Sequence, residues 1–263
     1  MRHQVNPNRG ILHFDPAQTN VRITRHLPSE QLRHLIQHYW FVEWNLEGQP
    51  PYTQEVLQHP GVNIVFEQGS SYVCGIESRK AAYTLQGKGM IVGILYRPGA
   101  FYGYSSEPMS ELVDCKVDIS RYFPFDAETA EKGIFASNRL EERVAFIEGL
   151  LSINIPEPDD KVDELNKIVR AIMEDRSLTS VDLLVNRFNA SKRTLQRMFK
   201  QYLGVSPKWV IQRYRMHEAS DAIENGADIT TVALELGYFD QAHFSKDFKA
   251  IVGASPHAYR RGD

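Results

Sequence analysis

Two segments of the chain, 49 residues apart, carry the same pattern of residues. Residues 195–207 read LQRMFKQYLGVSP and residues 244–256 read FSKDFKAIVGASP, with identity at the Phe-Lys pair, the glycine and the Ser-Pro pair. Self-similarity at a fixed spacing indicates that one supersecondary unit was built twice. Because both copies must adopt the same local structure, this repeat constrains the fold of the C-terminal hundred residues more than any other feature.

Each copy contains the parts of a helix-turn-helix unit. In the first unit, residues 184–188 are predicted to form a helix, Asn189 tolerates the positive φ of a sharp turn, and Ser191 caps a second helix. A helix, a short turn and a capped second helix make up the helix-turn-helix. The corresponding parts of the second unit are residues 229–236, Gly237 and Asp240.

The second helix of each unit has an apolar face and a polar face. In the first unit, apolar residues recur at steps of three and four from Leu195 to Tyr202, which predicts a side that packs in a core. The polar side suits a DNA groove, because Arg and Gln bond bidentately to guanine and adenine, Lys neutralises phosphate, and small residues approach a thymine methyl. An ordinary helical bundle is the alternative. The predicted DNA-contacting residues are Arg193, Gln196, Arg197 and Lys200 in the first unit, and Gln241, Ala242, Ser245, Lys246 and Lys249 in the second.

The charge of the chain is unevenly distributed. The net charge is −3, but from Asp160 onward 16 Lys and Arg stand against 14 Asp and Glu, whereas 14 stand against 19 in the rest. Residues 187–217 contain eight Lys and Arg and no acid. A basic run without countercharge suits phosphate, although a solvated helix face would have the same composition.

A connecting helix is predicted between the two units. Ser206 caps it, Pro207 occupies its first turn, and Asn225 with Gly226 ends it. A helix of about 18 residues is roughly 27 Å long at 1.5 Å per residue. Such a helix can hold two recognition helices near one DNA turn apart, which is roughly 34 Å.

Residues from about 161 to 261 resemble the DNA-binding domain of the AraC/XylS family of transcription regulators. The motifs that carry the resemblance are SKRTLQRMFK at 191–200, GVSP at 204–207, Asp240 through Phe248-Lys249, and GASP at 253–256. The resemblance implies double-stranded DNA and RNA polymerase as partners. It places base contacts on Arg193, Gln196 and Arg197 in the first unit, and on Gln241, Ala242, Ser245 and Lys246 in the second.

Two residues depart from the family pattern. Val185 stands where the family usually has a small alanine, which suggests looser packing in the first unit. Asp247 flanks the second recognition face and would repel phosphate. We therefore hypothesise that the first unit supplies more of the DNA affinity.

The first half of the chain predicts an α+β domain of mainly antiparallel strands with some helices. Residues 39–44, 62–67, 71–76 and 89–97 are short, rich in β-branched and aromatic residues, and bounded by turn residues, as strands are. Apolar spacing predicts helices at 27–37, 138–151 and 161–175. Residues 152–160 contain two prolines and predict a linker. The expected domains are a sensor or dimerisation domain at 1–155 and the DNA-binding domain at 160–263.

Aromatic residues of this first domain are candidates for an apolar ligand pocket. The segment is similar to a sensor type of the same family, through Tyr39-Trp40, residues 59–66 and residues 95–99. That resemblance implies control by a small molecule. The alternative is that the aromatic residues only fill a small core. The seven candidates are Tyr39, Trp40, Trp44, Phe66, Tyr96, Phe101 and Tyr102.

Several other classes of protein lack support in the sequence. The chain contains no G-x-S-x-G, P-loop, G-x-G-x-x-G or H-E-x-x-H motif, so no catalytic residues and no cofactor are expected. Cys74 and Cys115 offer no metal quartet, and their number fits a reducing compartment. The longest apolar run, residues 90–96, is too short to span a bilayer, and the start MRHQVNPNRG lacks the apolar core of a signal peptide. The cytoplasm is therefore the expected location.

Three alternatives stay open at this point. The first domain could have an enzymatic role, or the chain could be a ligand-binding or partner-binding module. Many relatives dimerise through the sensor domain, but two units in one chain already satisfy a two-groove geometry. A homodimer and a monomer are therefore both compatible with the sequence.

Overall fold

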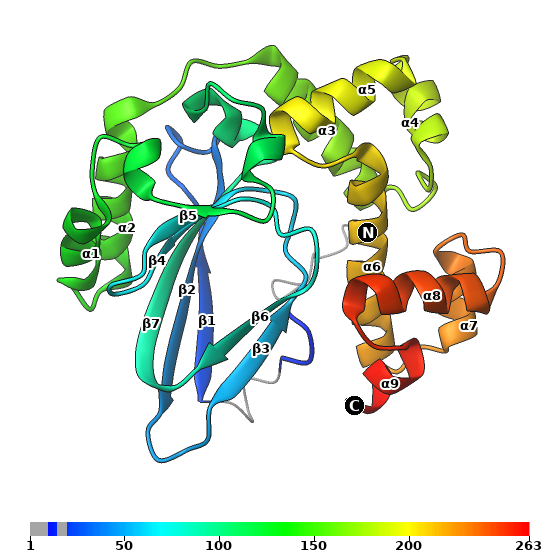
Figure 1. Ribbon diagram of the computed structural model, residues 1–263, viewed down its shortest axis with the longest axis horizontal. Coiled ribbons are helices and arrows are strands. Elements are labelled where there is room, and N and C mark those ends of the chain that lie inside the picture. The colour runs from blue at the N-terminus through cyan, green and yellow to red at the C-terminus, as the bar shows by residue number, and fades with distance from the viewer. Residues whose placement is uncertain (1–9, 15–19, 263) are drawn as a thin grey trace.

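The computed structural model describes residues 10–14 and 20–262, and it combines a sheet domain with a helical domain (Figure 1). This arrangement confirms the predicted fold class. Within the described residues no helix is long and apolar enough to cross a membrane. Residues 1–9, which make up most of the segment considered above for a signal peptide, lie outside the described residues. The strands are β1 (Val21–His26), β2 (Ile36–Leu46), β3 (Tyr52–Val56), β4 (Asn63–Phe66), β5 (Tyr72–Cys74), β6 (Ala81–Leu85), β7 (Gly87–Tyr96) and β8 (Lys116–Val117).

The α-helices follow the strands in the sequence. Short 3₁₀ helices lie between β7 and the end of the sheet domain, and a π-helical turn follows α5. The α-helices are α1 (Ala127–Phe135), α2 (Leu140–Leu151), α3 (Asp160–Glu174), α4 (Val181–Phe188), α5 (Lys192–Met198), α6 (Pro207–Glu224), α7 (Ile229–Glu235), α8 (Gln241–Val252) and α9 (Pro256–Arg261). The other helices are η1 (Ala100–Tyr104), η2 (Met109–Leu112), η3 (Ile119–Arg121), η4 (Ser152–Asn154) and the π-helical η5 (Phe199–Leu203).

The main sheet has the strand order β1-β2-β7-β4-β5-β8, and every pair in it is antiparallel. Strands β3 and β6 form a separate two-stranded sheet. Successive side chains of a strand point to opposite faces, so the main sheet can pack against two different layers. One face carries the helices α1 and α2, and the other faces β3 and β6 (Figure 1).

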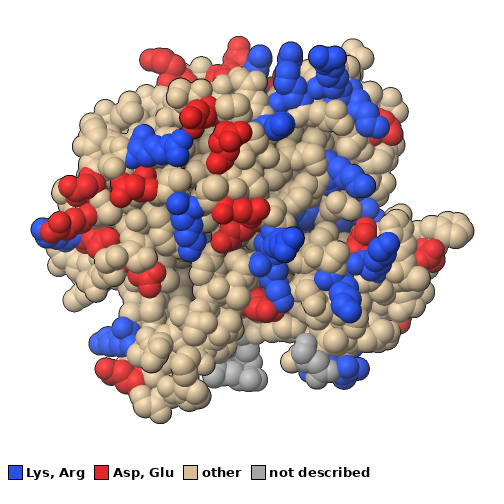
Figure 2. All heavy atoms as spheres, viewed as in Figure 1, with Lys and Arg blue, Asp and Glu red and all other residues tan. Residues whose placement is uncertain are grey.

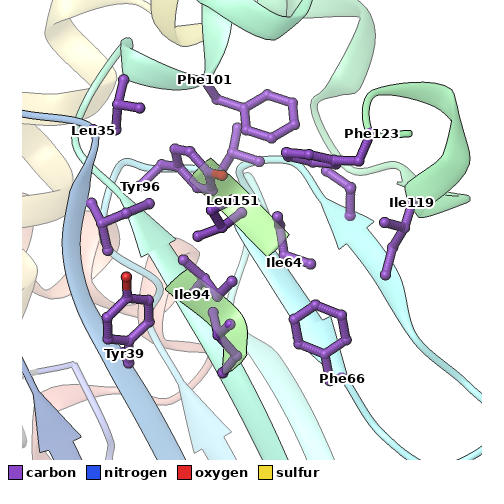
Figure 3. Packing of buried hydrophobic residues seen from close by; sticks show 14 of the residues in the cluster. Leu35, Tyr39, Ile64, Phe66, Ile94, Tyr96, Phe101, Ile119, Phe123 and Leu151 are labelled. Atoms are coloured by element: carbon purple, nitrogen blue, oxygen red, sulfur yellow. The ribbon is translucent and has the colours of Figure 1, made fainter. Parts of the chain in front are cut away.

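The face under the helices forms the largest core of the sheet domain (Figure 3). Tyr39, Phe66, Tyr96 and Phe101 are each 1% exposed or less, and they pack with aliphatic residues of the strands and of α2. The Tyr39 hydroxyl donates a hydrogen bond of 3.1 Å to the carboxylate of Glu148 on α2. These four aromatic residues therefore contribute to the packing between the helices and the sheet.

The predicted helix at residues 27–37 is wrong. Residues 30–35 form hydrogen-bonded turns, in which the amides of Leu35 and Ile36 bond to the carbonyl of Leu32. Strand β2 then begins at Ile36, because the following run of aromatic and β-branched residues pairs with β1 and β7. The predicted strands at 39–44, 62–67, 71–76 and 89–97 are confirmed within a few residues by β2, β4, β5 and β7.

The repeat is visible in the helical domain. Gly204 and Gly253 end the two recognition segments with φ values of 90° and 91°, which glycine adopts without strain. Ser206 caps α6 and Ser255 caps α9, each followed by a proline in the first turn. The copies differ in one respect, because α8 is continuous whereas α5 changes into the π-helical turn η5 at Phe199.

Trp40 rests on Gly93, its partner across strands β2 and β7. A methyl group at position 93 would overlap the indole ring, which a 3.1 Å hydrogen bond to Asn63 holds in place. We expect Gly93→Ala to lower the free energy of unfolding by about 1–3 kcal/mol through overpacking. Urea denaturation measures this change.

Gly149→Ala is the matched control, because Gly149 lies in α2 with no atom within 4 Å of the added methyl. Alanine there is expected to raise the free energy of unfolding by up to about 1 kcal/mol, since glycine is a poor helix former. Equal effects of the two substitutions would contradict the close packing at Gly93.

Candidate nucleic-acid interface

The first helix-turn-helix unit consists of α4 and α5. Asn189 adopts φ 48° in the turn, and the Ser191 hydroxyl accepts the amide of Thr194 to cap α5. These features confirm the anatomy predicted from the sequence. Leu195 and Met198 are buried on the core side of α5, and Phe199 follows them in η5.

The polar side of this unit is open to solvent. Arg193, Gln196, Arg197 and Lys200 are all exposed, and none of the four takes part in an ion pair with another described residue. Lys192, by contrast, lies 3.2 Å from the carboxylate of Asp182. Three cations on this face therefore have no countercharge among the residues that the structure describes, and they are available to an outside anion.

The second unit consists of α7 and α8. Gly237 has φ 74° in the turn, and Asp240 caps α8 by accepting the amide of His243. The side toward the core holds Phe244 and Phe248, both fully buried. The outer side holds the five residues predicted to contact DNA, of which Ala242, Lys246 and Lys249 are exposed, and Gln241 and Ser245 are half-buried.

Asp247 does not lie free beside the second recognition face. Its carboxylate accepts a hydrogen bond of 3.1 Å from the Tyr238 hydroxyl and lies 3.8 Å from the ring of His243. The side chain is only 24% exposed. Because the carboxylate is directed toward the turn after α7, its repulsion of phosphate is weaker than the sequence alone implies.

The helix α6 holds the two units together. It spans 18 residues, as predicted, and contributes Tyr214 to the cluster around α5 and Met216 to the cluster around α8. Arg215 stacks on Tyr238 at 4.1 Å and donates a hydrogen bond to the carbonyl of Leu236. Both recognition helices are thus packed against the same helix, α6.

The sheet domain also grips α6. Arg213 is 1% exposed, and its guanidinium donates hydrogen bonds to the carbonyls of Glu77 at 3.2 Å and Ser78 at 2.9 Å. Burial lowers the pKa of Arg213 to about 10. The Trp209 indole donates to the same Ser78 carbonyl at 3.2 Å, and the guanidinium lies over its ring. The loop before β6 therefore fixes the middle of α6.

Positive charge gathers over the helical domain. In Figure 2 the blue side chains crowd the upper right of the molecule and the region of α8, while red side chains are frequent over the sheet domain. This distribution agrees with the excess of Lys and Arg from Asp160 onward. A positive surface of this kind attracts a polyanion.

Comparison with known proteins identifies the units. A family described as a helix-turn-helix domain matches residues 184–262, and one described as a domain of unknown function (DUF6597) matches residues 24–118. The HTH-type transcriptional activator RhaS of Escherichia fergusonii is 30% identical over 142 residues, which cover 51% of each chain. The RhaS of Pectobacterium carotovorum is 36% identical over 78 residues, covering 29% of this chain and 28% of the relative. The chain thus spans about half the length of these relatives or less.

The chain belongs to the AraC/XylS family. Among solved structures, ToxT from Vibrio cholerae is 13% identical with a TM-score of 0.43, and the similarity covers 92% of this chain and 97% of ToxT. The C-terminal domain of AraT, a response regulator from Geobacillus stearothermophilus, is 30% identical with a TM-score of 0.35, covering 37% of this chain and 83% of that domain.

This AraC/XylS protein has a cavity of about 190 Å³ in its sheet domain. The cavity lies between the main sheet and the β3–β6 sheet, on the face that the helices leave open. Of the seven aromatic candidates only Trp40 lines it. Trp44 lies in a neighbouring apolar cluster, Tyr102 packs on Tyr202 of the helical domain at 4.4 Å, and the other four belong to the core under the helices.

The sequence reasoning missed the polar residues of this cavity. Arg25, His38 and His59 line it, and none of them was a candidate site residue, although His59 begins the motif at residues 59–66. His38 could have been found from the alternation of side chains along β2, because every second residue of a strand points to the same face. This alternation places His38 on the same face as Trp40 and Val42. That face could not be recognised as a cavity wall without knowing that β3 and β6 lie opposite.

The cavity touches the connecting helix of this AraC/XylS protein through His59. The ring of His59 lies 4.7 Å from that of His217 and 5.9 Å from that of Tyr214, both on α6. His217 is fully buried. His59, a side chain of the cavity wall, is therefore in direct contact with α6, the helix against which the recognition helices pack.

Proposed function

We propose that this chain is a sequence-specific DNA-binding transcription regulator. The observation that carries the proposal is the outer face of α5 and the adjoining η5, where Arg193, Gln196, Arg197 and Lys200 are exposed without an ion-pair partner among the described residues. These side chains read base edges and phosphates in the major groove. The outer face of α8 reads a second stretch through Gln241, Ala242, Ser245, Lys246 and Lys249.

We place the boundary between the two domains in residues 152–160, with the sensor domain at 1–155 and the DNA-binding domain at 160–263. A monomer that bridges two successive major grooves is the minimal DNA-bound species, and a homodimer through the sheet domain is the alternative arrangement. Since the relatives named above are transcriptional activators, we propose activation through contact with RNA polymerase, in the cytoplasm. We propose no catalytic, metal-binding or cofactor-binding role.

A small molecule in the sheet-domain cavity is proposed to control DNA binding. The support is the contact of His59 with His217 and Tyr214, because a ligand that displaces His59 also acts on α6. Of the aromatic candidates, Trp40 is the one we retain for direct ligand contact. The others act by holding the walls of the domain in place.

The proposal is tested by measuring DNA affinity of the full chain over a series of salt concentrations. The full chain is used because the sheet domain fixes α6 through Arg213 and Trp209. We expect the logarithm of the affinity for a duplex selected from a random library to fall linearly with the logarithm of salt, by about 0.9 per phosphate neutralised. Lys132→Ala, on the outer surface of α1, should leave the slope unchanged.

Two results would contradict the proposal. Absence of binding to any duplex at about 50 mM salt would favour the ordinary helical bundle. Binding with equal affinity to selected and random duplexes would remove the sequence-specific part and leave only phosphate contacts.

A further inference from the structure

The floor of the cavity is formed by side chains of the main sheet, which lie in rows across neighbouring strands. The register aligns Arg25 of β1 with Trp40 of β2 and Gly93 of β7, and it aligns His38 of β2 with Leu95 of β7 and Asn63 of β4 in the next row on the same face. Arg25 and His38 therefore occupy neighbouring positions at the β1 edge of the floor. His59 closes this end from the loop before β4.

This end of the cavity is basic, and the described residues that line it here include no carboxylate. Burial and the nearby charges of Arg25 and His59 lower the pKa of His38 to about 3. Burial also lowers the pKa of Arg25, whose Nε atom is buried without a hydrogen-bond partner among the described residues. A buried donor of this kind is costly unless a ligand or a water accepts a hydrogen bond from it.

Among the described residues that line the cavity there is one carboxylate, Glu67, and it lies at the far side. Glu67 directly follows β4, which is separated from β1 by two strands in the sheet. With strands about 4.8 Å apart, the backbones of β1 and β4 are roughly 14 Å distant. Glu67 thus leaves the basic end open for an anion from outside.

The space beside the basic end is mainly apolar. Ile23, Val42, Val65 and Ile91 form the floor, and Leu85 of β6 lies in the wall. A cavity of about 190 Å³ is slightly larger than one of about 150 Å³ that accepts benzene. Trp40 adds a flat surface next to Arg25, on which a ring or an alkyl chain can lie.

We propose that this cavity binds a small organic acid, with its carboxylate at Arg25, His38 and His59 and its apolar body on Trp40 and the aliphatic floor. Arg25 supplies the charge-assisted hydrogen bond, and neutral His38 serves as a further polar contact. The inference rests on the proposed function only in taking the cavity as the site of a controlling small molecule. It assigns the class of that molecule and the residue that selects it.

The test is calorimetric titration of the full chain with phenylacetate and octanoate, each compared with its uncharged primary amide. We expect at least one acid to bind, and to bind about tenfold or more tightly than its amide, because the amide lacks the charge that Arg25 recognises. Arg25→Gln should reduce this preference to less than about twofold while leaving affinity for the amide unchanged. Arg25→Lys, which retains the charge, should keep a measurable preference.

The matched control is Arg22→Gln. Arg22 lies on the same strand but pairs with Glu43, on the face opposite the cavity, and it is exposed. This variant should bind acid and amide as the unsubstituted chain does. Equal affinity of acid and amide for the unsubstituted chain, or absence of binding by both acids, would overturn the proposal, and so would an equal effect of the Arg22 and Arg25 substitutions.

Failure of this inference is distinguishable from failure of the proposed function. The titrations contain no DNA, and the salt series contains no acid. A chain that binds DNA specifically but no acid loses only the inference, whereas a chain that binds acid but no duplex loses the proposed function.

Discussion

Arg197→Glu is expected to weaken binding to the selected duplex by about a hundredfold, whereas Lys246→Glu weakens it by about tenfold. Arg197 presents its donors in a rigid planar fork that matches a base edge, whereas a lysine offers a compact charge on a flexible stem. Within the described part of the chain, the face that carries Arg197 has three cations without an ion-pair partner, and the face of α8 has two, Lys246 and Lys249. Fluorescence anisotropy with a labelled duplex measures both losses.

A second comparison separates base reading from phosphate attraction. Arg197→Ala should reduce the preference for the selected over a random duplex, while Lys249→Ala should weaken binding to both duplexes alike. Both residues are exposed, so circular dichroism should be unchanged in all these variants. Equal losses for Arg197→Glu and Lys246→Glu would refute the hypothesis that the first unit supplies more affinity. Asp247 accepts a hydrogen bond from Tyr238, so its charge contributes less to this difference than the sequence suggests. The hypothesis therefore depends on the number and type of cations on the two faces.

Phe248→Ala is expected to lower the free energy of unfolding by about 3–5 kcal/mol, the usual cost of deleting a buried phenyl ring. Phe248 is fully buried and packs against Phe244 at 5.6 Å and Tyr259 at 5.3 Å. Phe199 occupies the same position in the first copy of the repeat and is also fully buried. Phe199→Ala should therefore have an effect of the same size.

Phe239→Ala is the control for these two variants. Phe239 lies just before α8 and is 94% exposed, so its removal should change the free energy of unfolding by no more than about 0.5 kcal/mol. Denaturation in guanidinium chloride, followed by circular dichroism, measures all three. A loss below about 1 kcal/mol at either Phe199 or Phe248 would mean that the two copies are not equivalent in packing.

The helical domain was predictable from the sequence because its signals are local. Caps such as Ser191 and Asp240, and turn residues such as Asn189 and Gly237, act within a few positions of the helix they end or begin. The change from α5 to a π-helical turn at Phe199 was not predicted. The matching sequence of the second copy continues as an ordinary helix, and no residue we considered distinguishes them.

The sheet domain was predictable only in part, because strand pairing is not local. Strands β3 and β6 were missed, since Tyr52–Val56 and Ala81–Leu85 contain polar residues and are stabilised by each other. Because this pair of strands forms the wall opposite the main sheet, neither the cavity nor its basic residues could be predicted without it. The aromatic candidates were chosen by composition, and composition does not tell which face of a strand a residue occupies. Trp40 was the only one of the seven to reach the cavity for this reason.

The contact of the sheet domain with α6 has a consequence for how such proteins can diversify. Arg213 and Trp209 depend on two backbone carbonyls of the loop at Glu77 and Ser78, and Leu57 of the sheet domain lies in the same apolar cluster as Met216. A chimera that joins a foreign sheet domain at residues 152–160 would leave a buried guanidinium without acceptors. New specificities in this architecture should therefore arise by substitutions inside the cavity rather than by exchange of whole domains, and grafts should carry the loop together with α6.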